Sequence, residues 1–182
     1  MRRLVANAAM TVLAGSLVAC GVSQQQEVQM GQQEASQVNA QLPIIQDPGN
    51  VGTIIRTAAA LGAAATIGLP GTVDLWNAKV VRSAMGTHFH HVAVTATWDE
   101  LDAFRHERGA GLWAADASGS GEPLDRVARP PRLILVVGNE GSGITPSARE
   151  RADRLVTLPI AASVESLNVA VAAAIFLYEL NR

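Results

Sequence analysis

The chain has 182 residues and a mass of 19.0 kDa, which is the size of one domain with room for a short extra segment. Hydrophobic residues make up 48% of it and charged residues 16%, so intrinsic disorder is excluded for most of the chain. The formal net charge of −2 excludes a uniformly basic nucleic-acid coat, and the single cysteine, Cys20, excludes an intrachain disulfide and a cysteine-based zinc site.

The first 41 residues are interpreted as a leader and a linker. A basic start is followed by a largely apolar run over 4–19, which is typical of a secretory signal. The sequence LVACG at 17–21 resembles the lipobox of bacterial lipoproteins, in which the cysteine, here Cys20, is lipidated. An Ala-rich helix with an accidental cysteine, or a misplaced start codon, stays open as an alternative. Residues 23–41 are Gln-rich, so we expect a flexible linker or a solvated helix there and a globular domain over 42–182.

From residue 44 onward, short apolar runs alternate with helical patterns. We expect helices over 50–61, 76–85, 99–108, 146–151 and 165–180, and strands over 64–69, 92–95, 111–115, 133–137 and 155–158. Asn50 is the expected N-cap of the first of these helices and Gly62 its stop. The alternation predicts an α/β fold with a parallel sheet that is covered on both faces.

Three loops carry residues suited to chemistry, and loops of this kind gather at the carboxyl ends of parallel strands. The first, QDPGNVGTIIRTA over 46–58, runs into a helix whose free N–H groups suit a phosphate or carboxylate. The second, VGNEGSG over 137–143, has three glycines that let the backbone approach a ligand, but not the dinucleotide-binding spacing G-x-G-x-x-G. In the third, LPIAASVESLNVA over 158–170, Ser163 is expected to cap a helix and Ser166 to form its first turn.

Taken together, the three loops resemble the three ordered motifs of the SpoU/TrmH family of RNA 2′-O-ribose methyltransferases, in the knotted SPOUT superfamily. The family patterns are D-P-x-N-x-G-x-x-x-R-T-A, G-x-E-x-x-G and I/L-P-x-x-x-x-x-x-S-L-N-V-S/A, and all three occur here in order. The intervening KVVRSAMG over 79–86 also resembles a family segment, so the resemblance covers about residues 44–182.

The resemblance implies an α/β parallel-sheet SPOUT fold with a C-terminal trefoil knot. The implied reaction is methyl transfer from S-adenosylmethionine to a ribose 2′-hydroxyl of tRNA or rRNA. By motif position, Gly138, Leu158 and Leu167 would line the cofactor pocket, with Ala115 as a further candidate. The resemblance also implies a cytoplasmic homodimer whose active site is completed across the interface, and it implies no metal.

The resemblance further implies a catalytic set that comprises Asn50, Arg56, Glu140, Ser166 and Asn168. In the family the arginine is proposed to take the proton of the ribose hydroxyl, yet a guanidinium normally only donates hydrogen bonds. We therefore expect Arg56 to stabilise the developing alkoxide or to grip an adjacent phosphate. Asn50 and Asn168 would position Arg56 and the ribose. Glu140 would hold an arginine or a loop amide, and Ser166 would orient the RNA or cap the helix.

Contacts with RNA phosphates must be local, because the chain as a whole is not basic. Six arginines that cluster in the sequence could supply them, or could be solvated helix ends: Arg126, Arg129, Arg132, Arg149, Arg151 and Arg154. For the histidines His88, His90 and His91 we expect RNA-facing or structural roles, since no acidic or cysteine residue is spaced to complete a metal site with them.

Two features depart from the family pattern. The expected first strand, 38–45, contains Asn39, Gln41 and Pro43, which weaken a strand. The leader also conflicts with chemistry whose cofactor and RNA are cytosolic. Two interpretations therefore stay open: a cytosolic methyltransferase with an atypical leader, or a catalytically inactive binding module that is anchored to the membrane through Cys20.

Overall fold

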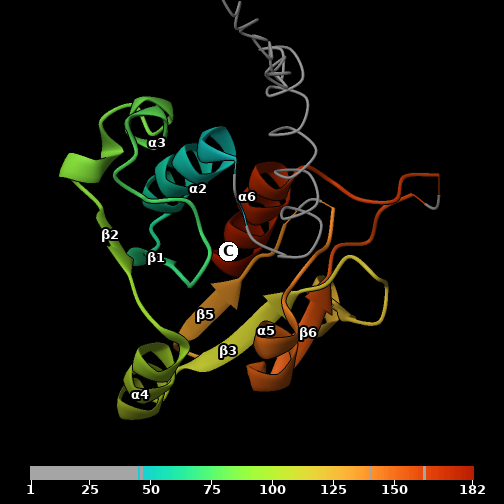
Figure 1. Ribbon diagram of the computed structural model, residues 1–182. Helices are drawn as coiled ribbons and strands as arrows, with labels where there is room; N and C mark the ends of the chain where they lie inside the picture. Colours follow the sequence, from blue (N-terminus) through green and yellow to red (C-terminus); the bar gives the residue numbers. More distant parts are fainter. Residues whose placement is uncertain (1–44, 46, 140, 162) are drawn as a thin grey trace, which may run out of the picture. The chain divides into compact units, whose positions relative to one another are not determined.

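A computed structural model describes residues 45, 47–139, 141–161 and 163–182 (Figure 1). The expected leader and linker with Cys20, the expected first strand up to residue 44, and Glu140 lie outside the described residues. Within the described ranges, no helix is both long and apolar enough to cross a membrane.

Helices and strands alternate along the described chain, as predicted. The α-helices are α2 (Pro48–Ala60), α3 (Ala78–Ser83), α4 (Trp98–Arg108), α5 (Pro146–Arg151) and α6 (Val169–Leu180), and the 3-10 helices are η1 (Thr87–Phe89) and η2 (Leu124–Arg126). The strands are β1 (Ala65–Gly68), β2 (Val92–Thr95), β3 (Gly111–Ala115), β4 (Glu122–Pro123), β5 (Leu133–Val136) and β6 (Arg154–Thr157). The prediction missed β4 and both 3-10 helices, which are only two or three residues long.

The strands form two parallel sheets, which confirms the predicted α/β class. One sheet pairs β1 with β2, and the other has the order β4-β6-β3-β5. In the larger sheet Ala114 of β3 lies opposite Val136 of β5, and Ala115 lies opposite Val156 of β6. Because all these strands are parallel, their carboxyl ends meet at one edge, and the loops that follow them meet there too.

Helix α2 packs directly on α3 and beside α6, and Figure 1 shows α2 and α6 side by side. Val51 and Ile55 of α2 are buried with Val80 of α3 in one core cluster. Gly52 makes the close approach possible, since a Cβ there would lie 2.5 Å from the Val80 carbonyl oxygen and 2.5 Å from Ser83 Cβ. The first turn of α2 is therefore fixed against α3.

Four helices, α2, α3, α4 and α6, begin at residues other than those predicted, and the starts of α2 and α6 bear on the site. Helix α2 begins at Pro48 rather than Asn50, because the Asp47 carboxylate caps it and accepts hydrogen bonds from the Gly49 and Asn50 N–H groups at 2.6 and 3.1 Å. Proline is favoured at the first position of a helix, directly after the cap. Asn50 is thus not the cap but a residue of the first turn. The predicted stop is confirmed, since Gly62 adopts a left-handed φ of 77° just after the helix.

Helix α6 begins at Val169 rather than at residue 165, because Asn168 is its N-cap. The Asn168 Oδ1 accepts hydrogen bonds from the N–H groups of Ala170 and Val171 at 3.0 and 3.2 Å. The predicted helix-start roles of Ser163 and Ser166 are therefore wrong, since both residues lie in the loop before α6.

Candidate active site

The loops after β3, β5 and β6 enclose one cavity of about 740 Å³. This volume lies within the range of small-molecule sites. Apolar walls come from Ile144, Leu158, Leu167 and Phe176, and much of the remaining lining is the glycine-rich loop after β5. The cavity therefore combines apolar side chains with accessible backbone groups.

The residues predicted to line a cofactor pocket meet in this cavity. Ala115 ends β3, Gly138 follows β5, and Leu158 and Leu167 follow β6, yet all four line it. Ser166, from the predicted catalytic set, also lines the cavity. Their convergence follows from the parallel order of the strands, which brings the three loops to one edge of the sheet.

The loop after β5 is a tight turn that its own backbone closes. The N–H of Asn139 donates to the Gly143 carbonyl at 2.9 Å, the Gly143 N–H donates back at 3.0 Å, and the Gly141 N–H donates to Asn139 Oδ1 at 3.0 Å. A Cβ on Gly138 would collide with the backbone of Gly143 and Ile144. Position 138 therefore needs a glycine for the turn to close.

The first and third motifs meet through two asparagines. The Asn168 Nδ2 donates to Asn50 Oδ1 at 3.1 Å, although 118 residues separate them. Because Oδ1 of Asn168 already accepts the two N–H groups at the start of α6, its Nδ2 is the atom that faces Asn50. This hydrogen bond ties the first turns of α2 and α6 together next to Leu167, which lines the cavity.

The remaining members of the predicted catalytic set differ in what surrounds them. Arg56 is exposed on α2 and makes no hydrogen bond or ion pair with any residue that the structure describes. Ser166 is exposed in the loop before α6. Arg56 is therefore a cation available to a ligand at the surface, one and a half to two turns beyond Asn50.

Sequence reasoning missed an ion pair in the cavity wall. Arg149 of α5 donates to Asp116 Oδ1 at 2.7 Å, and the hydroxyls of Ser118 and Ser120 each donate to Asp116 Oδ2 at 2.7 Å. The Asp116 side chain is 3% exposed. Burial raises the pKa of Asp116, but the hydrogen bonds from the two serines and Arg149 outweigh burial and lower it to about 2. The signal in the sequence was D-x-S-x-S directly after a strand.

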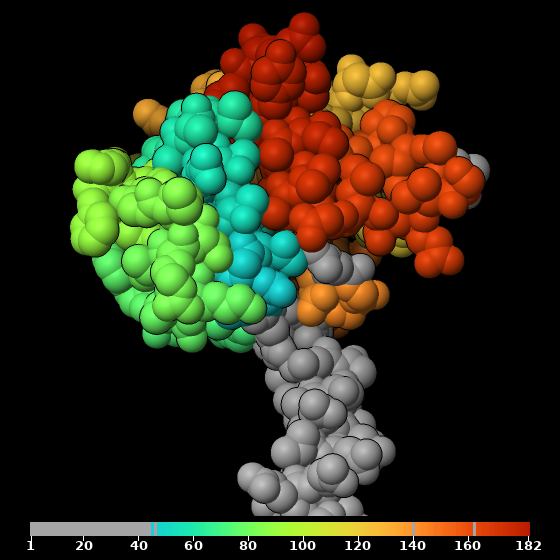
Figure 2. Space-filling model, turned by 90° about the horizontal axis from the view of Figure 1, so that it is seen from above, coloured from blue at the N-terminus to red at the C-terminus, as the bar shows by residue number. Residues whose placement is uncertain are grey.

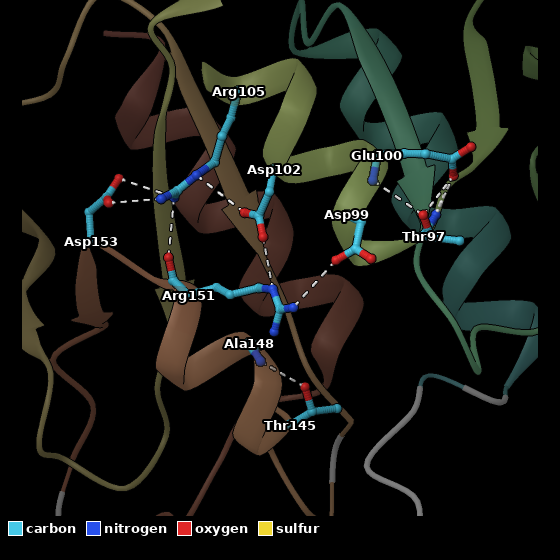
Figure 3. Close-up of polar contacts among 9 residues, drawn as sticks. All are labelled: Thr97, Asp99, Glu100, Asp102, Arg105, Thr145, Ala148, Arg151 and Asp153. Atoms are coloured by element: carbon cyan, nitrogen blue, oxygen red, sulfur yellow. Dashed lines mark hydrogen bonds and ion pairs between the residues drawn. The ribbon is translucent and has the colours of Figure 1, made fainter. Parts of the chain in front are cut away.

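A second network of charges joins α4, α5 and the start of β6 (Figure 3). Arg151 donates to Asp102 at 2.9 Å and lies 3.7 Å from Asp99, while Arg105 lies 3.4 Å from both Asp102 and Asp153. Asp102 thus sits between two arginines and is shared by both. The network therefore holds α4, α5 and the start of β6 together, and its charges are paired with one another rather than with a ligand.

The ion pairs of the arginines change the expectation that six of them contact RNA phosphates. Three of the six arginines proposed for phosphate contacts form ion pairs, with partners Asp116, Asp102 and Glu122: Arg149, Arg151 and Arg154. Arg132 donates to the Arg108 carbonyl at 2.7 Å. Within the described chain, only Arg126 and Arg129 of that cluster lack such a partner, so the cluster is mainly structural.

Two of the three histidines have structural roles. The His88 Nε2 donates to the Leu75 carbonyl at 2.8 Å, and His91 Nε2 lies 2.9 Å from Thr66 Oγ1. Burial, together with the nearby His88, lowers the pKa of His91. Among the residues described, no three His, Cys, Asp or Glu side chains are grouped so as to hold a metal ion.

Comparison with known proteins identifies relatives across most of the chain. The model of the SpoU rRNA Methylase family matches residues 37–178. The 23S rRNA (guanosine(2553)-2′-O)-methyltransferase RlmP of Bacillus subtilis (strain 168) is 41% identical over 141 residues, which are 75% of this chain and 55% of the relative. The 23S rRNA (uridine(2479)-2′-O)-methyltransferase of Streptomyces viridochromogenes is 38% identical over 141 residues, 74% of this chain and 49% of the relative. The chain thus spans about half the length of these curated relatives.

The fold is also similar to solved structures. The SpoU methyltransferase AviRb from Streptomyces viridochromogenes, in complex with the cofactor AdoMet, matches with a TM-score of 0.70 and 32% identity. That match covers 76% of this chain and 54% of the other. The similarity supports the α/β fold with parallel sheets.

Proposed function

Because the chain belongs to the SpoU rRNA methylase family, we propose that it transfers a methyl group from S-adenosylmethionine to a ribose 2′-hydroxyl of ribosomal RNA. The sequence motifs left tRNA and rRNA open, and the names of the relatives favour rRNA. The proposal depends on one observation: the three motif-bearing loops meet, with a cavity beside the hydrogen bond between Asn50 and Asn168.

The cavity suits S-adenosylmethionine in its chemistry. Backbone groups of the loop after β5 are available to the polar edge of a base, and Leu158 and Leu167 offer apolar surface to its faces. Glu165 also lines the cavity, and its carboxylate suits a ligand that carries positive charge, whereas the charge of Asp116 is neutralised by Arg149. When bound, the cofactor supplies an activated methyl group on a sulfonium, so the protein's main task is to align it with the hydroxyl.

Asn50, Asn168 and Arg56 would act on the ribose that receives the methyl group. Asn50 and Asn168 fix the first turn of α2 and so position Arg56, which α2 also carries. The Arg56 guanidinium would donate hydrogen bonds to the ribose oxygen as the hydroxyl proton passes to solvent water and negative charge develops there, or to the adjacent phosphate. Ser166 would orient the RNA from the loop before α6, and Glu140, which lies outside the described residues, would hold an arginine or a loop amide.

The proposal includes the knotted form of the fold. We propose that the segment after β6 threads through a loop to make the C-terminal trefoil knot. The insertion of β6 between β3 and β4 supports it, as does the meeting of three loops around one cavity. True knots are rare among folds, so this feature depends on the family and not on general packing rules.

The proposal also includes a homodimer. Helix α6 carries an exposed apolar row at the spacing of one helix face, formed by Val171 (49% exposed), Ile175 (38%) and Tyr178 (55%). Exposed apolar rows of this kind mark contact surfaces. Ala170 and Ala173 of the same helix are buried in the chain's own core, so the row and not the alanines supports the dimer.

For location we propose the cytoplasm, where the cofactor and ribosomal RNA are found, with residues 42–182 as the methyltransferase domain. Lipid anchoring through Cys20 is the alternative. Cell fractionation combined with mass analysis of Cys20 separates the two, since a lipidated cysteine adds mass and moves the chain to the membrane fraction.

A methyl-transfer assay tests the proposed function. The full chain is incubated with tritiated S-adenosylmethionine and unmodified rRNA or tRNA, and the labelled nucleoside is mapped. We expect a 2′-O-methylated nucleoside in rRNA, together with thermal stabilisation of about 2.7 kcal/mol when the cofactor is present at 100 times its Kd. Stabilisation without transfer would favour the inactive binding module, and the absence of both would contradict the proposal.

A further inference from the structure

Three of the five cationic side chains that have no partner among the described residues lie on two neighbouring helices. Of the lysines and arginines in the described ranges, five make no ion pair and no hydrogen bond: Arg56, Lys79, Arg82, Arg126 and Arg129. Three of them belong to α2 and α3. The other arginines are held by carboxylates or by a carbonyl, including Arg108 by Glu107 and Arg182 by Glu179. Free positive charge is therefore concentrated on the α2–α3 side, where a phosphate could bind without breaking an ion pair.

The aromatic side chains also fall into two groups, those that an arginine covers and those that none of the described cations covers. Arginines lie over the rings of Trp98, Phe104 and Tyr178, with guanidinium-to-centroid distances of 5.5, 5.7 and 5.8 Å. By contrast, among the described residues no cation lies over the rings of Trp76 (59% exposed) and Phe89 (76% exposed). The Trp76 ring lies beside the His88 ring, with a centroid distance of 5.0 Å and a tilt of 56°. These two rings are thus available to another flat group.

Cations without a partner and uncovered aromatic rings both occur on one short segment, residues 76–89, which comprises α3, η1 and the turns beside them. Asp74, a carboxylate just before the segment in the sequence, accepts a hydrogen bond from the Trp76 backbone N–H at 3.0 Å. The segment lies against α2, because Gly52 contacts Val80 and Ser83, and Figure 2 shows it (green) beside α2 (cyan) on one face. Gly52 is two residues from Asn50, so the segment borders the candidate active site.

We propose that segment 76–89 binds an unpaired stretch of RNA, with Trp76 and Phe89 stacking on bases and Lys79 and Arg82 contacting phosphates. Bases of unpaired RNA stack on aromatic side chains, while the backbone follows positive charge. A contact surface between two copies of the chain is the other occupant to consider, but lysine is depleted at such surfaces. The inference rests on the proposed function for its choice of RNA as the ligand.

Fluorescence anisotropy with a labelled single-stranded RNA of about 12 nucleotides, and with the matching duplex, tests this inference on the full chain. The double variant Trp76→Ala/Phe89→Ala should weaken binding of the single strand at least about tenfold. The control Phe104→Ala removes an exposed aromatic ring that Arg108 covers and that lies outside the proposed dimer row, and it should change the Kd less than about twofold. Lys79→Gln/Arg82→Gln should lower the slope of log K against log salt concentration by about 1.4.

Tryptophan fluorescence gives a second measurement that does not depend on large side-chain truncations. Trp113 is buried and Trp98 is covered by Arg151, so Trp76 is the tryptophan that RNA should quench. Trp76→Phe should abolish the quenching and keep the affinity within a few fold, because a ring remains to stack.

Three results would overturn the inference: no binding of single-stranded RNA by the wild type, equal losses in Trp76→Ala/Phe89→Ala and in the control Phe104→Ala, or dissociation of a dimer in Trp76→Ala/Phe89→Ala with unchanged RNA affinity. The proposed function fails separately. A wild type that neither binds the cofactor nor transfers methyl, yet loses RNA affinity on Trp76→Ala/Phe89→Ala, would contradict the reaction while supporting the RNA surface.

Discussion

The Asn168 side chain caps α6 with its oxygen and donates its nitrogen to Asn50 at 3.1 Å, so one amide both starts a helix and joins it to α2. Asn168→Asp separates these two roles. Aspartate is as good an N-cap as asparagine, but it has no donor for Asn50. We expect thermal stability to change by less than about 0.5 kcal/mol while methyl transfer falls at least about tenfold. Asn168→Ala is the comparison, since it should also lose about 1 kcal/mol of stability with the cap.

Arg56 is predicted to act on the RNA and not on the cofactor, because it does not line the cavity. Arg56→Ala should lower methyl transfer at least about 100-fold, as expected for the loss of a group that stabilises developing charge. The affinity for S-adenosylmethionine, measured by calorimetry, should be unchanged. Arg154→Ala is a suitable control, since its exposed pair with Glu122 lies away from the site. Retained turnover in Arg56→Ala would remove Arg56 from the mechanism.

Gly138 is predicted to be irreplaceable in the cavity wall. In Gly138→Ala the new methyl group must displace the Gly143 backbone, which should cost about 1–3 kcal/mol of stability and weaken cofactor binding. Gly141, three residues away in the same loop, has no atom within 4 Å of a Cβ placed on it. Gly141→Ala should therefore change the free energy of unfolding by less than about 0.5 kcal/mol. Equal effects of the two substitutions would contradict the packing argument.

Asp116 should give the protein an acid-sensitive component of stability. Its pKa in the folded chain is about 2, below the ordinary value of 3.8, so the carboxylate stabilises the fold above about pH 5. That stabilisation, about 2 kcal/mol, should be lost as the pH falls from 5 toward 2. Chemical denaturation across this range measures it. Asp116→Asn cannot titrate, so its stability should fall less steeply with acid than that of the wild type. Parallel curves for the two proteins would show that Asp116 is not the group responsible.

Asp102 should contribute more to stability than its neighbour Asp99. Asp102 pairs with both Arg105 and Arg151, whereas Asp99 is 95% exposed and lies 3.7 Å from Arg151 alone. Asp102→Ala should cost about 1 kcal/mol, and Asp99→Ala less than about 0.5 kcal/mol. The difference should shrink in 1 M salt, where exposed charges are screened within about 3 Å. A difference that persists in salt would point to packing instead of charge.

Local patterns in the sequence predicted the regular elements well. Strands 92–95 and 111–115 and helix 146–151 have the predicted bounds, because apolar runs and turn residues delimit them within the chain itself. Helix starts were less predictable. Several residues near each start can cap, and the choice of Asp47 over Asn50, or of Asn168 over Ser163, is settled by which side chain reaches the first N–H groups.

The site was predictable only through the ordered motifs. Spacing alone could not show that Asn50 and Asn168 touch, since their hydrogen bond spans 118 residues. The ion pair of Asp116 with Arg149 escaped prediction for the same reason, as its partners are 33 residues apart and on different elements. The positions of Glu140 and Cys20, and their predicted roles, lie outside what the structure describes.

Many of the arginines form ion pairs within the chain, and this affects the rate at which the protein associates with RNA. Electrostatic steering over distances beyond about 8 Å depends on the net field of a molecule, and a net charge of −2 gives a polyanion no long-range attraction. Encounter with RNA should therefore proceed at the unsteered rates of about 10⁵–10⁶ M⁻¹s⁻¹. Selection among RNA sites would then fall to the lifetime of the complex.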